Sequence, residues 1–163
     1  MTRSHIETVL EDVAPALMGY FLRRTSDPDD AADLVGETLT EAWRSSRRMP
    51  KERETARMWV FGVARNTHRH HVRGRIRRDA LVSALGNTIA QATGEVSDDD
   101  LDVRHAIAAL PADLAELIRL VHWDGFTLEQ TAVHLGIPAS TARSRHSRAK
   151  ELLRVALASV VDS

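Results

Sequence analysis

The sequence predicts an all-α protein in which two small helical domains are joined by an acidic flexible linker. Apolar residues recur at three- and four-residue spacing along most of the chain, and no segment shows a convincing strand alternation. A stretch of weak periodicity, residues 83–102, separates two helical units. The 163 residues suffice for one ordinary domain or two very small ones. We therefore expect domains at 1–80 and 104–160 and a linker at 81–103.

The first domain is expected to begin with two amphipathic helices. The apolar stripe of the first comprises Ile6, Val9, Leu10, Val13, Leu17 and Phe21. Ser26-Asp27-Pro28 then marks a boundary, because a capping residue precedes a proline that suits a first helical position. The residues that the next helix, about 28–46, should bury are Ala31, Leu34, Val35, Leu39, Ala42 and Trp43. Its other face carries an acidic row: Asp30, Asp33, Glu37 and Glu41.

A third helix, from about Thr55, leads into the most basic segment of the chain. Its inward residues are expected to be Trp59, Val60, Val63 and Thr67. The segment "RNTHRHHVRGRIRR", residues 65–78, contains six arginines, three histidines and no carboxylate. Arg65, Arg69 and Arg73 recur every four residues and therefore form one ridge on the helix. By itself the segment is compatible with a phosphate-binding surface, a metal site, a targeting tag or a solvated helix face.

The linker and the second domain follow. Residues 83–102 combine small residues and two glycines with a cluster of carboxylates: Glu95, Asp98, Asp99, Asp100 and Asp102. A helix is expected from near Val103, and Pro111 marks its boundary. The next apolar stripe comprises Leu114, Leu117, Ile118 and Val121.

Residues 127–154, "TLEQTAVHLGIPASTARSRHSRAKELLR", have the pattern of a helix-turn-helix. Thr127 and Gln130 form a capping box, because each side chain can bind a backbone donor at the start of the first helix. The small, apolar and turn-forming residues that this motif requires follow in order: Ala132, Leu135, Gly136, Ile137 and Pro138. Leu135 is expected to be a core anchor, and Pro138 to lie in the first turn of the second helix.

The second helix of this motif is expected to bind duplex DNA. Its start and outer surface carry Ser140, Thr141, Arg143, Ser144, Arg145 and Arg148. Hydroxyls and arginines at a helix N-terminus suit phosphates and guanine edges in a major groove. The alternative is a helical hairpin with a solvated basic face. His146 falls on the apolar face with Ala142, Ala149 and Leu153, where we expect a boundary residue of the core rather than a ligand.

Composition limits the kinds of function that the chain can have. The formal net charge is only -1, but acidic and basic residues are segregated, which indicates partners of different sign. The absence of cysteine excludes disulfides, thiol catalysis and thiolate metal sites. No stretch approaches the roughly 18–20 apolar residues of a membrane span, so we expect a cytoplasmic protein. The candidate metal ligands are His68, His70 and His71. They lack a nearby carboxylate, and we expect no metal and no cofactor.

Four segments in a fixed order carry a family resemblance. They are "DAADLVGETLTEAW" (30–43), "WVFGVARN" (59–66), "LPADLAELIRLVHWDGFT" (110–127) and the helix-turn-helix. Together they resemble the extracytoplasmic-function (ECF, group 4) sigma factors of the bacterial sigma-70 family. The first two segments are similar to region 2 of that family, and the last two to regions 4.1 and 4.2. The resemblance implies a non-enzymatic transcription initiation factor that binds core RNA polymerase, directs it to promoters and helps to open the duplex.

The resemblance also implies roles for individual residues. The acidic row, Asp30, Asp33, Glu37 and Glu41, matches the face that docks on the clamp helices of the largest polymerase subunit. Region 4 is expected to contact the flap of the second-largest subunit. Residues matched to the downstream (minus-10) element are Arg65, Asn66, Arg69, His70 and Arg73. Residues matched to the upstream (minus-35) element are Ser140, Thr141, Arg143, Ser144, Arg145 and Arg148. An anti-sigma factor is a further expected partner.

The sequence departs from the family pattern at a few positions. Gly36 stands where glutamine is usual, Gln130-Thr131 replace Glu-Ile, and Ala142 and His146 replace aliphatic residues. Trp59 and Phe61 are possible stacking platforms for a base, although the helical pattern places Trp59 in the core. One rival hypothesis is a conventional helix-turn-helix regulator with an N-terminal sensing or dimerisation domain. Another is a small helical metalloenzyme built on the histidines.

Overall fold

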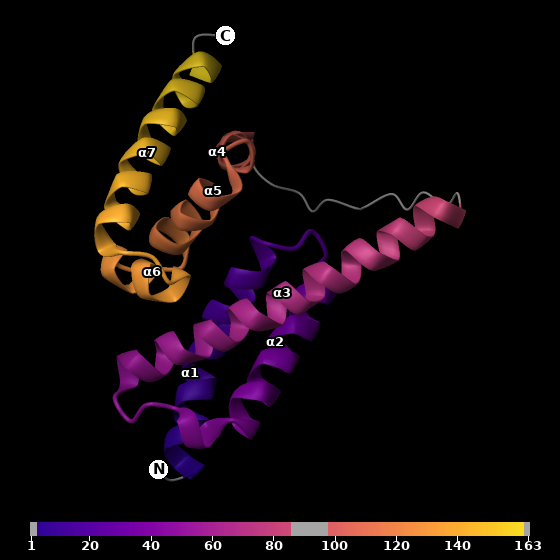
Figure 1. Cartoon of the computed structure of the whole chain (residues 1–163), viewed down its shortest axis with the longest axis vertical. Coiled ribbons are helices and arrows are strands. Elements are labelled where there is room, and N and C mark those ends of the chain that lie inside the picture. Colours follow the sequence, from indigo (N-terminus) through magenta and orange to yellow (C-terminus); the bar gives the residue numbers. More distant parts are fainter. Residues whose placement is uncertain (1–2, 86–97, 162–163) are drawn as a thin grey trace. The chain divides into compact units, whose positions relative to one another are not determined.

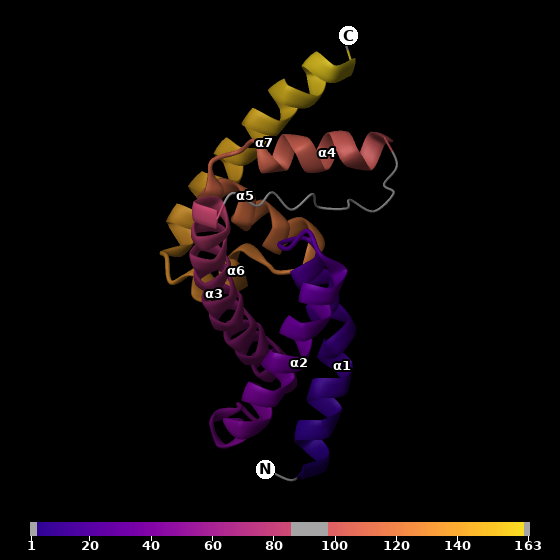
Figure 2. The same cartoon turned by 90° about the vertical axis from the view of Figure 1, so that its right-hand side faces the viewer.

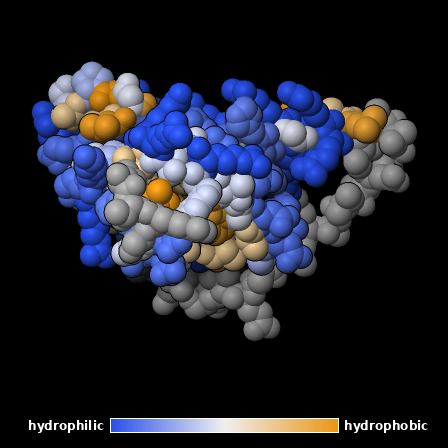
Figure 3. Space-filling model, turned by 90° about the horizontal axis from the view of Figure 1, so that it is seen from below, coloured by the Kyte–Doolittle hydropathy of each residue, from blue (hydrophilic) through white to orange (hydrophobic). Residues whose placement is uncertain are grey.

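A computed structural model describes residues 3–85 and 98–161 of the chain, and every regular element within these ranges is helical. The chain divides into two compact units, Met1–Thr93 and Gly94–Ser163 (Figure 1). Among the described residues, no helix is long and apolar enough to cross a membrane. Hydrophilic side chains cover most of the coloured surface in Figure 3, and hydrophobic ones gather in small patches.

The first unit is built from three helices that pack against one another (Figures 1 and 2). They are α1 (Arg3–Leu22), α2 (Pro28–Arg44) and α3 (Arg53–Leu85), with a short 3-10 turn, η1 (Ser46–Arg48), between the last two. An aromatic cluster forms the centre of the core. The Tyr20 ring lies edge-on to Phe21 at 5.2 Å and to Phe61 at 5.5 Å between ring centroids, and all three residues are buried. Edge-to-face packing of this kind adds to the stabilisation from the buried area.

The start of α2 confirms the predicted boundary. The side chain of Asp27, the N-cap residue, accepts a hydrogen bond of 2.9 Å from the backbone N–H of Asp29, and Pro28 opens the helix. The buried face differs from the prediction at Trp43, which is 40% exposed. Thr38 is fully buried instead, and its hydroxyl donates a 2.7 Å hydrogen bond to the Leu34 carbonyl. This backbone bond satisfies the hydroxyl, so a polar residue is tolerated in the core.

Helix α3 is a single helix of 33 residues that carries the whole basic segment. Its C-terminal part projects beyond α1 and α2 (Figure 1), and residues 76–81 are all exposed. Residues 81–85, expected in the linker, therefore still belong to this helix.

The second unit begins with α4 (Asp98–Ala108), so part of the acidic run is helical rather than linker. Asp98, Asp99 and Asp100 are the first three residues of this helix. Glu95 lies outside the described residues. The helices that follow are α5 (Ala112–Ile118), a π-helical turn η2 (Arg119–Trp123), α6 (Leu128–Leu135) and α7 (Ala139–Val161). Helices α4, α5 and α6 all pack against α7.

The core of this unit confirms most of the predicted stripe. One cluster of buried residues contains Ile107, Leu114, Ala115, Ile118 and Ala149. The other contains Leu117, Ala132 and Ala142, with Ile137 packed against it. Ala142, a departure from the family pattern, is thus fully buried where α7 meets α5 and α6. Leu135 is only half-buried, and the buried position beside Ala132 is taken by Thr131.

The helix-turn-helix, α6 and α7, has the predicted local geometry. Both hydrogen bonds of the capping box between Thr127 and Gln130 are present, each at 3.0 Å. Gly136 adopts a left-handed conformation with φ +69°, which side chains with a Cβ rarely adopt. Pro138 precedes α7 rather than lying within it, and its carbonyl accepts the first hydrogen bond of the helix, from the Ala142 N–H at 3.1 Å.

Candidate nucleic-acid interface

The exposed face of α7 presents the residues predicted to contact duplex DNA. Ser140, Arg143, Ser144 and Arg148 are exposed, and Thr141 is half-buried. Arg145 differs, because its Nε lies 3.8 Å from a carboxylate oxygen of Asp113 on α5. The side chain is therefore directed to the flank that packs on the rest of the unit. The structure brings together the hydroxyls, Arg143 and Arg148 and sets Arg145 apart.

The basic face of α3 presents the second predicted set. Asn66, Arg69, His70 and Arg73 are exposed, and Arg65 is half-buried. Among the described residues, no carboxylate pairs with the three arginines of the ridge, Arg65, Arg69 and Arg73. Unpaired cations at helical spacing are available to neutralise the phosphates of a nucleic-acid backbone.

A polar pocket of about 550 Å³ lies beside this ridge, between α3 and the end of α2. It is lined by Glu41, Ser45, Arg48, Trp59, Val63, Asn66, Thr67 and His70. Asn66 and His70, one turn apart on α3, thus share a pocket with an indole ring. Trp59 is half-buried there, whereas the sequence predicted a place in the core. Phe61 is fully buried against Tyr20 and is therefore not available as a stacking platform.

A basic connection between α2 and α3 was not predicted to have a role. The segment "RSSRRMPKER", residues 44–53, contains five basic residues and one acidic residue. Arg44, Arg47, Arg48 and Lys51 are exposed and, within the part of the chain that the structure describes, have no ion-pair partner. Arg48 also lines the pocket. The charge count alone was a usable signal, although the stretch lies between the two helices expected at about 28–46 and from about Thr55.

The acidic row on α2 is less uniform than predicted. Asp33 and Glu37 are exposed, and no hydrogen bond or ion pair holds either side chain among the described residues. Asp30 lies 3.8 Å from Nε2 of His71 on α3. Glu41 accepts a 3.0 Å hydrogen bond from the Ser45 hydroxyl and lines the polar pocket. Only the middle of the row is therefore free for a basic partner.

The three histidines of the basic segment have different surroundings. His70 lines the pocket, His71 faces Asp30, and the His68 ring lies 6.5 Å from the Phe21 ring. Within the described residues, no group of three or more histidine, cysteine, aspartate or glutamate side chains could hold a metal ion. The arrangement gives the metalloenzyme hypothesis no support.

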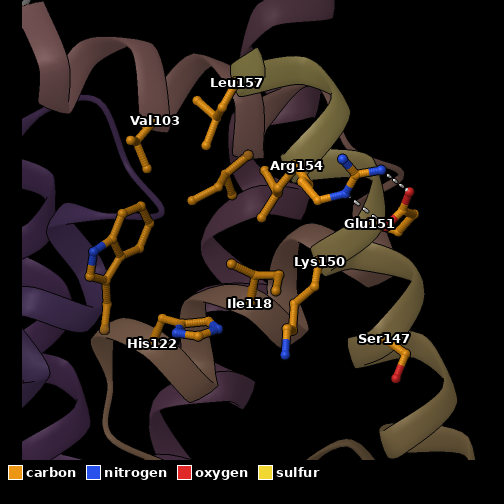
Figure 4. Close-up of a pocket in the computed structure, with 11 residues that line it drawn as sticks. Val103, Ile118, His122, Ser147, Lys150, Glu151, Arg154 and Leu157 are labelled. Carbon is orange, nitrogen blue, oxygen red and sulfur yellow. Dashed lines mark hydrogen bonds and ion pairs between the residues drawn. The ribbon is translucent and has the colours of Figure 1, made fainter. Parts of the chain in front are cut away.

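An apolar groove of about 740 Å³ lies in the second unit. Its apolar lining comprises Val103 and Ile107 from α4, Ile118 from α5, Trp123 from η2, and Leu153 and Leu157 from α7. Figure 4 shows Val103, Ile118 and Leu157 with His122 around the groove, and Arg154 turned toward Glu151. This pair, Arg154 Nη2 to Glu151 Oε1 at 2.6 Å, places both charges beside an apolar surface.

A helix-turn-helix in one unit and a basic helix beside a polar pocket in the other define a nucleic-acid-binding protein of two helical units. Residues 9–78 match the family model for Sigma-70 region 2, and residues 100–153 match that for Sigma-70, region 4. The chain belongs to the ECF sigma factors of the sigma-70 family. It is thus a non-catalytic factor for promoter recognition by RNA polymerase. This assignment replaces the rival hypothesis of a conventional helix-turn-helix regulator.

Individual relatives agree with this assignment. The chain is 31% identical to the ECF RNA polymerase sigma factor SigL of Mycobacterium tuberculosis, over 93% of this chain and 88% of SigL. It is 30% identical to the ECF sigma factor EcfG of Rhodopseudomonas palustris, over 88% of this chain and 80% of EcfG.

Solved structures show the same fold. One is the sigma factor RpoE of Bartonella quintana in complex with the anti-sigma factor NepR, with a TM-score of 0.73 and 30% identity over 93% of this chain and 95% of RpoE. Another is CnrH in complex with the cytosolic domain of CnrY, with a TM-score of 0.69 and 18% identity over 97% of this chain and 90% of the matched chain.

Proposed function

We propose that the two units divide promoter recognition, with the second reading the minus-35 element as duplex and the first reading the minus-10 element as a separated strand. The observation that carries this division is the pocket beside the arginine ridge of α3. A groove-reading helix needs an exposed polar face, which α7 has. A single strand instead needs cations for its backbone and a site for an unstacked base, which α3 and its pocket offer together.

At the minus-35 element, Arg143 and Arg148 lie on the exposed face with Ser140 and Ser144. Arginine on a guanine edge discriminates against the wrong base by about 1–3 kcal/mol, and hydroxyls bind phosphates. Arg145 is assigned a different role. Its proximity to Asp113 ties α7 to α5 and so positions the reading helix.

At the minus-10 element, the base that leaves the stack is held in the pocket. Trp59 provides a flat apolar surface on which the base stacks. Asn66 and His70 provide groups that hydrogen-bond to the base. Arg65, Arg69 and Arg73 hold the phosphates, and the basic connection at 44–51 extends the same positive surface.

Two surfaces are proposed for the polymerase. The exposed carboxylates Asp33 and Glu37 face the clamp helices of the largest subunit, where a basic partner surface would complement them. The apolar groove of the second unit receives the flap of the second-largest subunit, because a groove of this size and lining fits the apolar face of an amphipathic helix.

An anti-sigma factor is the remaining proposed partner. RpoE of Bartonella quintana was solved in complex with the anti-sigma factor NepR, and CnrH in complex with the cytosolic domain of CnrY. We propose that a protein of this kind covers the same apolar groove and thereby competes with the flap.

The division of labour is tested by footprinting and permanganate reactivity of holoenzyme on promoters recovered from genomic fragments. Arg143→Ala is expected to weaken protection of the upstream element. Arg69→Ala with Arg73→Ala should leave that protection intact and reduce the reactivity of unpaired thymines downstream. Arg104→Ala, an exposed arginine on α4, is the control for loss of one positive charge. Identical defects in both sets of variants would refute the division.

A further inference from the structure

His146, the histidine on the apolar face of α7, lies against a second histidine. Its Nε2 is 3.4 Å from Nε2 of His122 on η2. The two rings are nearly parallel, with an angle of 21° between their planes and 5.5 Å between their centroids. His122 also lines the apolar groove proposed for the flap, but no contact proposed above uses the two histidines as a pair.

The spacing of the two nitrogens suits a tetrahedral metal ion. Zinc–imidazole bonds are about 2.0–2.1 Å long, which puts two nitrogens of one tetrahedron about 3.3–3.4 Å apart. The observed 3.4 Å between the two Nε2 atoms agrees with this spacing. In the absence of an ion, the Nε2–H of one ring can donate a hydrogen bond to Nε2 of the other. Neither nitrogen then lacks a hydrogen-bond partner.

The charged side chains around the pair limit how tightly it can hold a cation. The ammonium of Lys150 opposes a cation, whereas Glu151, which lines the same groove as His122, pairs with Arg154. The positive charge of Lys150 and the pairing of Glu151 with Arg154 therefore favour modest rather than tight binding of a metal ion by the two histidines.

We propose that His122 and His146 form a two-histidine site for a divalent transition metal of the Zn²⁺, Ni²⁺ or Cu²⁺ type. Imidazole nitrogens prefer such ions over Mg²⁺ and Ca²⁺. The other ligands are water, because His122 lies in the wall of the open groove (Figure 4). A bound ion ties the turn that precedes the helix-turn-helix to the reading helix α7 and so couples metal supply to the stability of this unit.

The site is tested on the full chain with ZnCl₂, and with MgCl₂ as the control ion. Zinc at tenfold excess over its Kd should raise the midpoint of thermal unfolding by about 5 °C, and magnesium should not. Calorimetry should show that His122→Gln and His146→Gln each weaken this binding event at least about tenfold, since loss of even an outer partner has effects of that order. His105→Gln, an exposed histidine on α4, should retain it.

A second variant guards against misfolding. His146→Leu restores an aliphatic residue on the apolar face, so it should fold at least as stably as the original chain and still lose the zinc-dependent shift. An unchanged zinc affinity in either His146 variant would overturn the proposal. A zinc-dependent shift no larger than that with magnesium would do the same.

Discussion

The aromatic residues at positions 59 and 61 have opposite surroundings although they lie on the same helix. Trp59 is half-buried in the wall of the polar pocket. Phe61 is fully buried, packs edge-on to Tyr20, and lies under the guanidinium of Arg57 at 5.0 Å. Positions two apart on a helix point in nearly opposite directions, so one side chain supports the fold while the other faces the proposed strand.

This difference predicts distinct effects of truncation. Phe61→Ala should lower the free energy of unfolding of the first unit by about 3–5 kcal/mol, because it leaves a cavity in the aromatic cluster. Trp59→Ala should change stability much less but weaken binding of single-stranded minus-10 DNA by about 1–3 kcal/mol, the value of one stacked base. Urea unfolding and fluorescence anisotropy measure the two effects. Equal affinity of Trp59→Ala and the original chain for the strand would remove the pocket from the proposed mechanism.

The two arginines at 143 and 145 allow a similar separation on α7. Arg145→Ala breaks a partly exposed pair with Asp113, which is worth at most about 1 kcal/mol, and should reduce stability slightly. It should weaken binding to all minus-35 sequences by the same small factor. Arg143→Ala should instead relax the preference at one base pair, which competition with substituted duplexes measures. A base-specific defect in Arg145→Ala would reverse these assignments.

Among the elements, those with local signals were predictable from the sequence. The helix-turn-helix was predicted because its capping box, its left-handed glycine and its proline act within a few residues of one another. Features that depend on tertiary packing were not. Burial of Thr38 in place of Trp43, and the pocket that joins Trp59 to His70, arise only when α2 and α3 meet.

The acidic run shows a different limit. Aspartates lack apolar periodicity, so a linker was expected where α4 begins at Asp98. A hydrophobic pattern therefore does not report the start of this helix. The contact between His122 and His146 was equally inaccessible, because 24 residues separate them in sequence.

Two glycines, one inside a helix and one in a turn, predict opposite responses to one substitution. A Cβ at Gly36, in the middle of α2, would meet no atom within 4 Å, so Gly36→Ala should stabilise the first unit by about 1 kcal/mol. Gly136 has φ +69°, and Gly136→Ala should destabilise the second unit by about 1–2 kcal/mol. Urea titrations of both variants make the comparison. A loss of stability in Gly36→Ala would mean that α2 needs glycine for a reason that the fold does not reveal.

For the whole molecule, the segregation of charge matters more than its sum of -1. The exposed carboxylates of the acidic row lie on α2, whereas the exposed arginines of the two proposed DNA-binding sets lie on α3 and α7, and others lie on the connection before α3. A chain with this distribution can bind a basic protein surface through its carboxylates and two segments of DNA through its arginines. Both kinds of contact are screened by salt, so holoenzyme assembly and promoter binding should weaken together as ionic strength rises.

The most direct test of this account is run-off transcription by core RNA polymerase over genomic fragments, with and without the purified chain. We expect discrete transcripts that require the chain and disappear with the double variant Asp33→Lys, Glu37→Lys, which should keep its helical content by circular dichroism. The control, Glu11→Lys with Asp79→Lys, makes the same change in net charge at exposed positions elsewhere in the first unit and should remain active. Wild-type transcription by the Asp33→Lys, Glu37→Lys variant would contradict polymerase docking through α2, and the absence of any chain-dependent transcript would contradict the account as a whole.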